Sequence, residues 1–158
     1  MILVTLGTQK FQMDRLVQAV DELAKNVSEE IFVQTGNSTY VPKYCMAKNF
    51  VDAQEFQNMI EECSVLITHS GVGTIMRGIG VGKPVVVVPR LAKYHEHVDD
   101  HQVQIAEAFA SKGCVLYCAD LAKLEETVQK ARTHSFSMYH APKSNVEDII
   151  LEFLHNSK

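Results

Sequence analysis

The sequence lacks the marks of membrane-spanning, secreted and nucleic-acid-binding proteins. It has no run of about 18 consecutive apolar residues, the length that a membrane-spanning helix requires. Basic residues are not in excess, because 15 lysines and arginines stand against 19 acidic residues and both signs are scattered. This balance argues against a nucleic-acid-binding face. The opening residues, MILVTLGTQ, contain no basic segment and no cleavage site of a secretory signal, and are typical of a buried strand.

Cysteine is also scarce and shows no pattern of disulfides or metal ligands. The four cysteines, Cys45, Cys63, Cys114 and Cys118, include no CxxC pair. We expect them to be reduced thiols that pack as small hydrophobic residues. With 158 residues, 46% of them apolar, the chain is long enough to bury roughly 70% of its unfolded surface, which predicts a single domain over residues 1–158.

Short β-branched runs alternate with longer amphipathic segments along the whole chain. We expect strands at residues 2–6, 30–34, 48–50, 65–68, 85–88 and 115–118, and helices at residues 12–25, 53–62, 73–80, 98–112, 121–131 and 144–155. The strand segments are almost continuously apolar, as parallel strands covered on both faces are. This alternation predicts an α/β domain of the Rossmann-like, three-layer kind, with a parallel sheet and right-handed crossovers.

Ligands of such sheets bind in the loops at the carboxyl ends of the strands, here residues 7–11, 35–39, 69–74 and 89–102. The strongest motif in these loops is Val65-Leu-Ile-Thr-His-Ser-Gly-Val-Gly-Thr74, an apolar run that leads through a glycine-rich turn into a helix. Its two glycines allow backbone N–H groups to approach a ligand closely, and the start of the helix attracts an anion. The turn therefore indicates a diphosphate site, with a tight turn that binds nothing as the alternative.

Two common phosphate-binding motifs are excluded at this turn. The dinucleotide fingerprint GxGxxG, counted from Gly71, would need a third glycine where the chain has Met76. A Walker A loop ending at Gly82-Lys83 would need a glycine where the chain has Arg77 and a hydroxyl residue where it has Pro84.

A second polar cluster occupies residues 89–102. Its histidines His95, His97 and His101 resemble some zinc ligand sets, but neither a cysteine nor a regular helical spacing supports a zinc site. We therefore expect no metal there. His101 and Gln102 could instead form hydrogen bonds to sugar hydroxyls, for which side-chain amides are well suited.

Three segments in this order resemble the C-terminal, donor-binding half of the family 28 glycosyltransferases. They are His69-Ser-Gly-Val-Gly-Thr74, Gly82-Lys-Pro-Val-Val-Val-Val-Pro-Arg90 and Asp100-His-Gln102, and the segments Val4-Thr-Leu-Gly-Thr8 and Val33-Gln-Thr-Gly36 fit as well. The resemblance covers nearly the whole chain and implies a domain equivalent to the C-terminal half of a GT-B glycosyltransferase. It is strongest to stand-alone subunits of two-component enzymes, among them the dolichol-linked GlcNAc transferase subunit and bacterial capsule and exopolysaccharide transferase subunits.

The resemblance also implies which residues bind the UDP-sugar donor. They are His69, Ser70, Gly71, Gly73 and Thr74 for the pyrophosphate, Phe50 and Val51 for the uracil, His101 and Gln102 for the sugar, and Gly7 and Thr8 near the reacting centre. Some of these have a purely structural alternative. Phe50 and Val51 could belong to the core, His69 could be a hydrogen-bonded residue at a strand end, and Thr8 could cap the first helix.

Arg77 departs from the family pattern, which usually has a glutamate there that binds the ribose hydroxyls. Because arginine cannot accept hydrogen bonds, either another acceptor replaces this carboxylate or the donor binds less tightly. The chain shows no obvious general base, and a GT-B enzyme has two Rossmann-like halves. The resemblance thus implies that a membrane-associated partner supplies the acceptor half and the base, while His69 is a candidate for stabilising the leaving group.

The function implied by the resemblance is that of a hexosyltransferase subunit. It would transfer a sugar from a UDP-sugar to a lipid-linked acceptor with inversion, in polysaccharide or glycan biosynthesis, without a metal or other cofactor. The chain would be cytoplasmic, recruited to the cytoplasmic membrane face by its partner, and able to self-associate when isolated. The alternatives are a nucleotide-sugar-binding module without catalysis and a structural subunit. The sequence does not identify the donor sugar.

Overall fold

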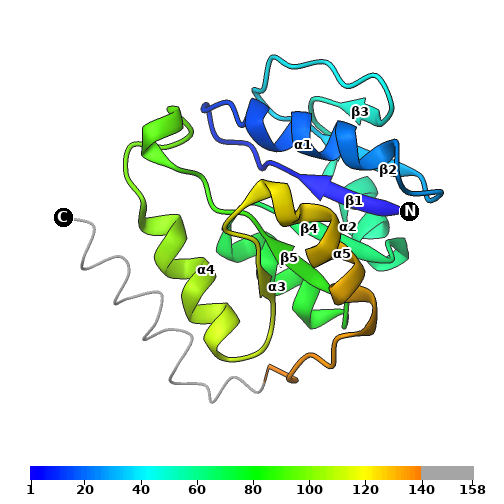
Figure 1. The fold of residues 1–158 in the computed structure, drawn as a ribbon, viewed down its shortest axis with the longest axis vertical. Coiled ribbons are helices and arrows are strands. Elements are labelled where there is room, and N and C mark those ends of the chain that lie inside the picture. Colours follow the sequence, from blue (N-terminus) through cyan, green and yellow to red (C-terminus); the bar gives the residue numbers. More distant parts are fainter. Residues whose placement is uncertain (140–158) are drawn as a thin grey trace.

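The computed structural model describes residues 1–139 as an α/β domain (Figure 1). The strands are β1 (Ile2–Thr5), β2 (Ile31–Gln34), β3 (Met46–Lys48), β4 (Val65–Thr68), β5 (Val85–Val87) and β6 (Leu116–Tyr117). The helices are α1 (Asp14–Ala24), α2 (Ala53–Glu62), α3 (Val72–Gly80), α4 (His101–Ser111) and α5 (Leu124–Thr133), with short 3₁₀ turns at Ala92–Tyr94 and Leu121–Lys123. The helix predicted at residues 144–155 lies outside the described residues.

The strands form one parallel sheet with the order β3-β2-β1-β4-β5-β6, which confirms the predicted architecture. The chain proceeds from β1 to β2 and β3 on one side and then returns to β4 on the other, so the direction of winding reverses between β1 and β4. The two loops that leave this point start side by side, because Thr5 is in register with Thr68. Doubly wound sheets bind their ligands at such a reversal, outside the carboxyl ends of the strands.

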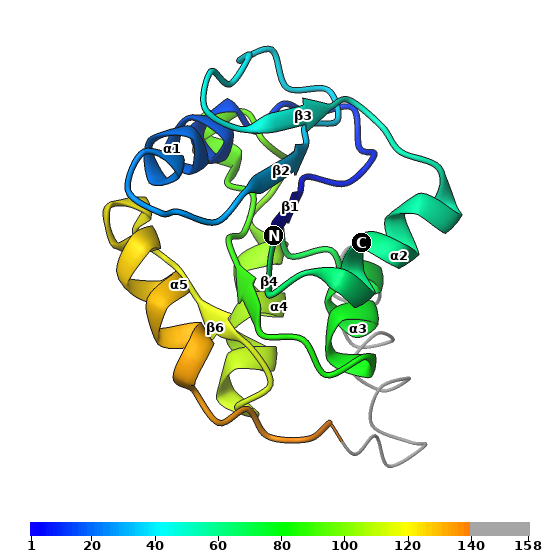
Figure 2. The same ribbon diagram turned by 90° about the vertical axis from the view of Figure 1, so that its right-hand side faces the viewer.

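Alternate residues of the strands pack against helices on opposite faces of the sheet. Figure 2 shows α1 and α5 on one side of the sheet and α2 and α3 on the other. Ile2 and Val4 belong to the core on the α1 and α5 side, whereas Leu3 belongs to the core beneath α2, α3 and α4. Because helices cover both faces, both sets of strand side chains must be apolar, and this explains the almost continuous apolar runs.

Several element boundaries differ from those expected by one to three residues, and the largest differences are at the starts of two helices. The helix predicted from residue 98 begins only at His101, because residues 91–100 fold into a polar loop that contains a 3₁₀ turn and a left-handed residue, His95. The segment 121–131 is divided into a 3₁₀ turn and α5, and the Asp120 carboxylate accepts a hydrogen bond from the Ala122 N–H (3.0 Å) where the turn begins. None of the helices described is long and apolar enough to cross a membrane.

The start of α2 depends on one side chain. The Asp52 carboxylate accepts a hydrogen bond from the backbone N–H of Glu55 (2.8 Å), as an N-cap residue does. We expect Asp52→Ala to lower the free energy of unfolding by about 1 kcal/mol, because that N–H loses its acceptor. Chemical denaturation would measure the loss. Asp52→Asn retains an acceptor and should be nearly as stable as the wild type, so an equal loss in both variants would contradict the capping role.

Candidate donor-binding site

A cavity of about 480 Å³ opens at the carboxyl edge of the sheet, between the loops that follow β1 and β4. Its lining comes from the β1 end and loop, the end of β2, the start of α2, and the turn between β4 and α3. The lining residues are Thr5, Gly7, Thr8, Gln9, Gln34, Val51, Ala53, Phe56, His69, Gly71, Gly73, Thr74 and Arg77. The cavity therefore lies where the winding of the sheet reverses.

Gln34 holds the first loop of the cavity in place. Its amide nitrogen donates hydrogen bonds to the carbonyl oxygens of Gly7 (3.0 Å) and Asn49 (2.8 Å), and its Oε1 accepts one from the Thr5 hydroxyl (2.6 Å). Gly7 has a φ of 74°, a conformation that residues with a Cβ rarely adopt. A single buried amide thus joins the end of β1, the first loop and the segment after β3.

The turn between β4 and α3 presents unpaired backbone N–H groups. Gly71 is the N-cap residue of α3, and its carbonyl accepts a hydrogen bond from the N–H of Ile75 (3.1 Å). The N–H groups of Val72, Gly73 and Thr74 have no backbone acceptor within the described part of the chain, as is usual in the first turn of a helix. A Cβ built on Gly73 would meet no atom within 4 Å, so the space in front of the turn is open. Such a helix start can bind phosphate oxygens.

The imidazole of His69 lies between two glycines of the cavity wall. A Cβ on Gly7 would lie 2.5 Å from its Nε2, and a Cβ on Gly71 would lie 2.5 Å from its Cε1. Neither position therefore has room for a side chain unless the ring moves. Burial, together with the nearby charge of Arg90, lowers the pKa of His69 to about 4. The ring is consequently neutral at ordinary pH.

Arg77, at which the sequence departs from the resemblance described above, lines the same cavity from α3. Its guanidinium carbon lies 5.8 Å from the centre of the Phe56 ring. Phe56 and Val51 give this part of the cavity an apolar wall, against which a planar base can pack. The arginine adds a positive charge that complements a diphosphate.

Gln102 and His101 lie outside the cavity lining. Gln102 is 2% exposed, and its Oε1 accepts a hydrogen bond from the Arg90 N–H (3.0 Å), while its Nε2 lies 3.2 Å from the Nδ1 of His69. Both ends of the amide are therefore bonded to protein groups. His101 is the first residue of α4, and its ring contacts the Asp99 carboxylate.

Three side chains from the end of the loop before α4 and the first residue of that helix form a cluster. Potential ligand atoms of His97, Asp99 and His101 lie within 4.8 Å of one another, whereas His95 is not part of the group. The Asp99 carboxylate accepts a hydrogen bond from the His101 N–H (3.1 Å), and both rings approach it through Nδ1. Hydrogen bonds at the start of the helix therefore explain why these three side chains lie together. The positive end of the helix dipole disfavours a cation at that place.

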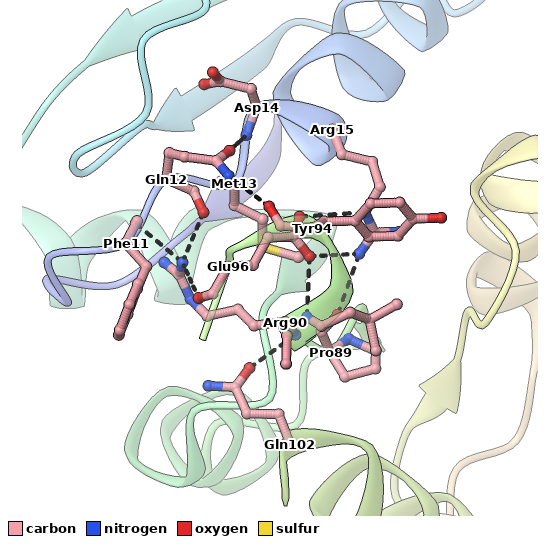
Figure 3. Close-up of polar contacts among 12 residues, drawn as sticks. Phe11, Gln12, Met13, Asp14, Arg15, Pro89, Arg90, Tyr94, Glu96 and Gln102 are labelled. Atoms are coloured by element: carbon pink, nitrogen blue, oxygen red, sulfur yellow. Dashed lines mark hydrogen bonds and ion pairs between the residues drawn. The ribbon is translucent and has the colours of Figure 1, made fainter. Parts of the chain in front are cut away.

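A buried arginine connects this loop to the first loop of the cavity (Figure 3). The Arg90 guanidinium donates hydrogen bonds to the carbonyl oxygens of Phe11 (3.0 Å), Gln12 (3.2 Å) and Glu96 (3.2 Å), and it also contacts that of Leu6. The Glu96 carboxylate is fully buried and forms an ion pair with Arg15 (2.9 Å). Arg90 thus contacts the chain on both sides of the Gly7 turn, and Glu96 connects the same loop to α1 through Arg15.

The structure brings most of the predicted donor-site residues together, but not all. Those that line the cavity are Gly7, Thr8, Val51, His69, Gly71, Gly73 and Thr74, and those outside its lining are Phe50, Ser70, His101 and Gln102. Phe50 is 50% exposed, so the alternative that it belongs to the core is wrong. Thr8 does not cap the first helix either, because the N-cap residue of α1 is Met13.

The sequence interpretation missed several lining residues, namely Thr5, Gln9, Gln34, Ala53 and Phe56, and treated Arg77 only as a departure from the family. One signal was available for two of them. Thr5 and Gln34 are polar residues at the carboxyl ends of two apolar strands, and such residues usually face a ligand crevice.

A parallel sheet of this order, with a glycine-rich strand–helix turn at its reversal point, defines a domain of the Rossmann type. Residues 1–153 match the family described as "Glycosyltransferase family 28 C-terminal domain", and the chain belongs to this family.

A human relative and two solved structures are similar over most of the chain. The UDP-N-acetylglucosamine transferase subunit ALG13 of Homo sapiens is 28% identical over 126 residues, which are 74% of this chain and 11% of the relative. The chain thus spans about a tenth of the length of that protein. The match to an NMR solution structure of ALG13 covers 96% of this chain and 94% of that structure, with a TM-score of 0.61 and 16% identity. The calicheamicin glycosyltransferase CalG4 covers 99% of the chain, which spans 43% of it, with a TM-score of 0.65 and 16% identity. The fold matches the C-terminal half of GT-B glycosyltransferases.

Proposed function

We propose that the chain is the donor-binding catalytic subunit of an inverting glycosyltransferase that uses a UDP-sugar. The acceptor is lipid-linked, and a second, membrane-associated subunit binds it and carries the chain to the cytoplasmic face of the membrane. UDP-GlcNAc is the donor to test first, because the human relative is named a UDP-N-acetylglucosamine transferase subunit. The observation that carries the proposal is the open glycine turn at the start of α3, inside the cavity.

The cavity supplies a complementary group for each part of a UDP moiety. The unpaired N–H groups of residues 72–74 and the dipole of α3 complement the two phosphates. Val51 and Phe56 offer an apolar surface for the uracil, and Arg77 adds a positive charge beside them. The side-chain oxygens of Thr8 and Gln9 are hydrogen-bond acceptors in the same lining, where the usual glutamate of the family is replaced.

The reaction requires stabilisation of charge on the leaving group. The acceptor hydroxyl attacks the anomeric carbon of the sugar, the bond from that carbon to the phosphate oxygen breaks, and negative charge develops on the UDP. Fixed N–H donors at that oxygen lower the barrier, because they need no rearrangement when the charge appears. The helix start at Gly71 and the imidazole of His69 are the groups of this chain placed for that task.

The described wall of the cavity contains no carboxylate. His69, its one histidine, is buried and has a pKa of about 4, so it is a weak base. A base for the acceptor hydroxyl has then to come from elsewhere, and this supports a two-subunit enzyme. The same observation favours one second candidate, a nucleotide-sugar-binding module without catalysis.

Binding and transfer measured on the same preparation separate the two candidates. We expect calorimetry to show that the isolated chain binds UDP-GlcNAc and UDP. GDP-mannose should bind less tightly, because guanine is larger than the uracil that we place beside Phe56 and Val51. The chain alone should release little or no radiolabelled sugar. Transfer to a lipid fraction should appear when membranes from the source organism, which hold the second subunit, are added.

Three outcomes would contradict the proposal in whole or in part. If the chain did not bind UDP, its ligand would not be a UDP-sugar. Full transfer by the purified chain alone, unchanged by the membranes, would remove the need for a second subunit, whereas binding without transfer under any condition would favour the non-catalytic module.

A further inference from the structure

The side-chain amide of Gln102 has one orientation that satisfies both of its ends. The backbone N–H of Arg90 can only donate, so the Gln102 atom 3.0 Å from it is the oxygen, Oε1 (Figure 3). The other end of the amide is then the NH₂ group, which has hydrogens but no acceptor lone pair. This nitrogen lies 3.2 Å from the Nδ1 of His69.

The contact decides which nitrogen of the His69 ring carries the proton. Because the Gln102 NH₂ group donates, Nδ1 must accept through its lone pair, and the single proton of the neutral ring is on Nε2. The surrounding charges favour a neutral ring. Burial, Arg90 and His97 all lower the pKa of His69, and their combined effect outweighs the hydrogen bond from Gln102, which raises it.

The Nε2 atom lies at the cavity wall. It is close to the backbones of Gly7 and Gly71, and His69 is one of the residues that line the cavity. Among residues 1–139 this nitrogen has no hydrogen-bond partner in the structure, whereas Nδ1 is bonded to Gln102. The N–H group of the ring, at Nε2, is thus available to a ligand, whereas the lone pair of Nδ1 is occupied by Gln102.

We propose that Gln102 is a positioning residue that holds His69 as the neutral Nε2–H tautomer, so that the ring presents a permanent hydrogen-bond donor to the diphosphate of the sugar donor. The part that concerns the diphosphate rests on the proposed function. A ring fixed in this way donates to the leaving phosphate oxygen, and it does not take the proton of the acceptor hydroxyl, because Nε2 already carries one. For Gln102 this role differs from the contact with the donor sugar that the family resemblance implies.

Long-range proton–nitrogen NMR spectra test the tautomer without any ligand. In the isotope-labelled wild type, the His69 signals, assigned by their loss in His69→Asn, should show a protonated Nε2 and a bare Nδ1 from about pH 5 to about pH 8. In Gln102→Glu, one carboxylate oxygen can still accept the hydrogen bond from the Arg90 N–H. The second carboxylate oxygen faces the Nδ1 of His69 as an acceptor, so we expect the proton of the ring to lie on Nδ1 in this variant. Gln104→Glu adds the same charge at an exposed position of α4 and should leave the wild-type tautomer.

Two NMR results would overturn the inference. The first is a wild-type ring with its proton on Nδ1, a measurement that does not depend on whether any variant folds. The second is a folded Gln102→Glu protein whose His69 still has a bare Nδ1.

Calorimetry with UDP-GlcNAc tests the consequence for binding. As the pH rises from about 5.5 to about 8, the affinity of Gln102→Glu should fall by about tenfold relative to the affinities of the wild type and Gln104→Glu. At the lower pH the His69 ring of Gln102→Glu is charged and has a proton on Nε2, whereas at the higher pH the ring is neutral and its Nε2 is bare. An unchanged pH dependence would overturn the link to the diphosphate. If no protein bound UDP-GlcNAc, the proposed function would fail, while the tautomer would still be decided by the spectra.

Discussion

Replacing Gly73 with valine is expected to weaken the binding of UDP-GlcNAc by roughly 100-fold, or about 2.7 kcal/mol, without unfolding the chain. A Cβ at Gly73 would meet no protein atom within 4 Å, so the protein itself has room for the side chain. The valine would occupy the space in front of the free N–H groups of the turn. A phosphate bound to those groups needs the same space. Calorimetry would measure the affinity, and thermal unfolding would show that the fold is retained.

Gly80→Val is the matched control for this experiment. Gly80 is the last residue of the same helix, and a Cβ there also meets nothing within 4 Å, but the residue does not line the cavity. Both variants replace a glycine of α3 with a β-branched residue, so only the position relative to the cavity differs. We expect wild-type affinity in Gly80→Val. Equal affinity in the two variants would place the diphosphate elsewhere. Gly71→Val would be less informative, because its side chain would collide with His69.

The order of strands and helices could be predicted because its signals are local. The strand Val65–Thr68 is an uninterrupted apolar run, and the helix Ala53–Glu62 begins after a capping aspartate, so both were predicted with the bounds that the structure has. The start of α4 could not be predicted in this way. The loop before it is shaped by Glu96, whose buried carboxylate pairs with Arg15 at a distance of 81 positions in the sequence. No local sequence pattern predicts a contact between residues so far apart in the chain.

The same distinction between local sequence signals and long-range contacts applies to the candidate site. The glycine turn of residues 69–74 is a contiguous motif whose physical meaning is independent of the rest of the fold. Gln34 and Gln102 act through partners 27 and 33 positions away, Gly7 and His69, and only the folded chain brings these together. Family resemblance assigned Gln102 to the donor sugar, but its amide is bonded at both ends to protein groups in the structure. Its role was therefore the hardest to predict from sequence.

Replacing Arg90 with methionine is expected to lower the free energy of unfolding by about 3–5 kcal/mol, because each buried carbonyl oxygen that loses its donor costs about 1–3 kcal/mol. Arg90 is 1% exposed, and its guanidinium bonds to carbonyl oxygens on both sides of the Gly7 turn. Methionine fills a similar volume but leaves these oxygens without a donor. A total stability of about 5–15 kcal/mol is usual for a domain, so chemical denaturation should show the loss clearly.

Arg90→Lys and Arg77→Met separate the possible causes of that loss. Lysine retains the charge and up to three N–H donors, although not the planar arrangement of five donors that a guanidinium has, so we expect a loss smaller than that of Arg90→Met. Arg77→Met makes the same chemical change at an exposed position on α3 and should alter stability by no more than about 0.5 kcal/mol. If Arg90→Met were as stable as Arg77→Met, the buried hydrogen bonds would not be what fixes the first loop. In that case the position of Gly7 in the cavity wall would depend on the amide of Gln34, which donates a hydrogen bond to the carbonyl oxygen of Gly7 itself.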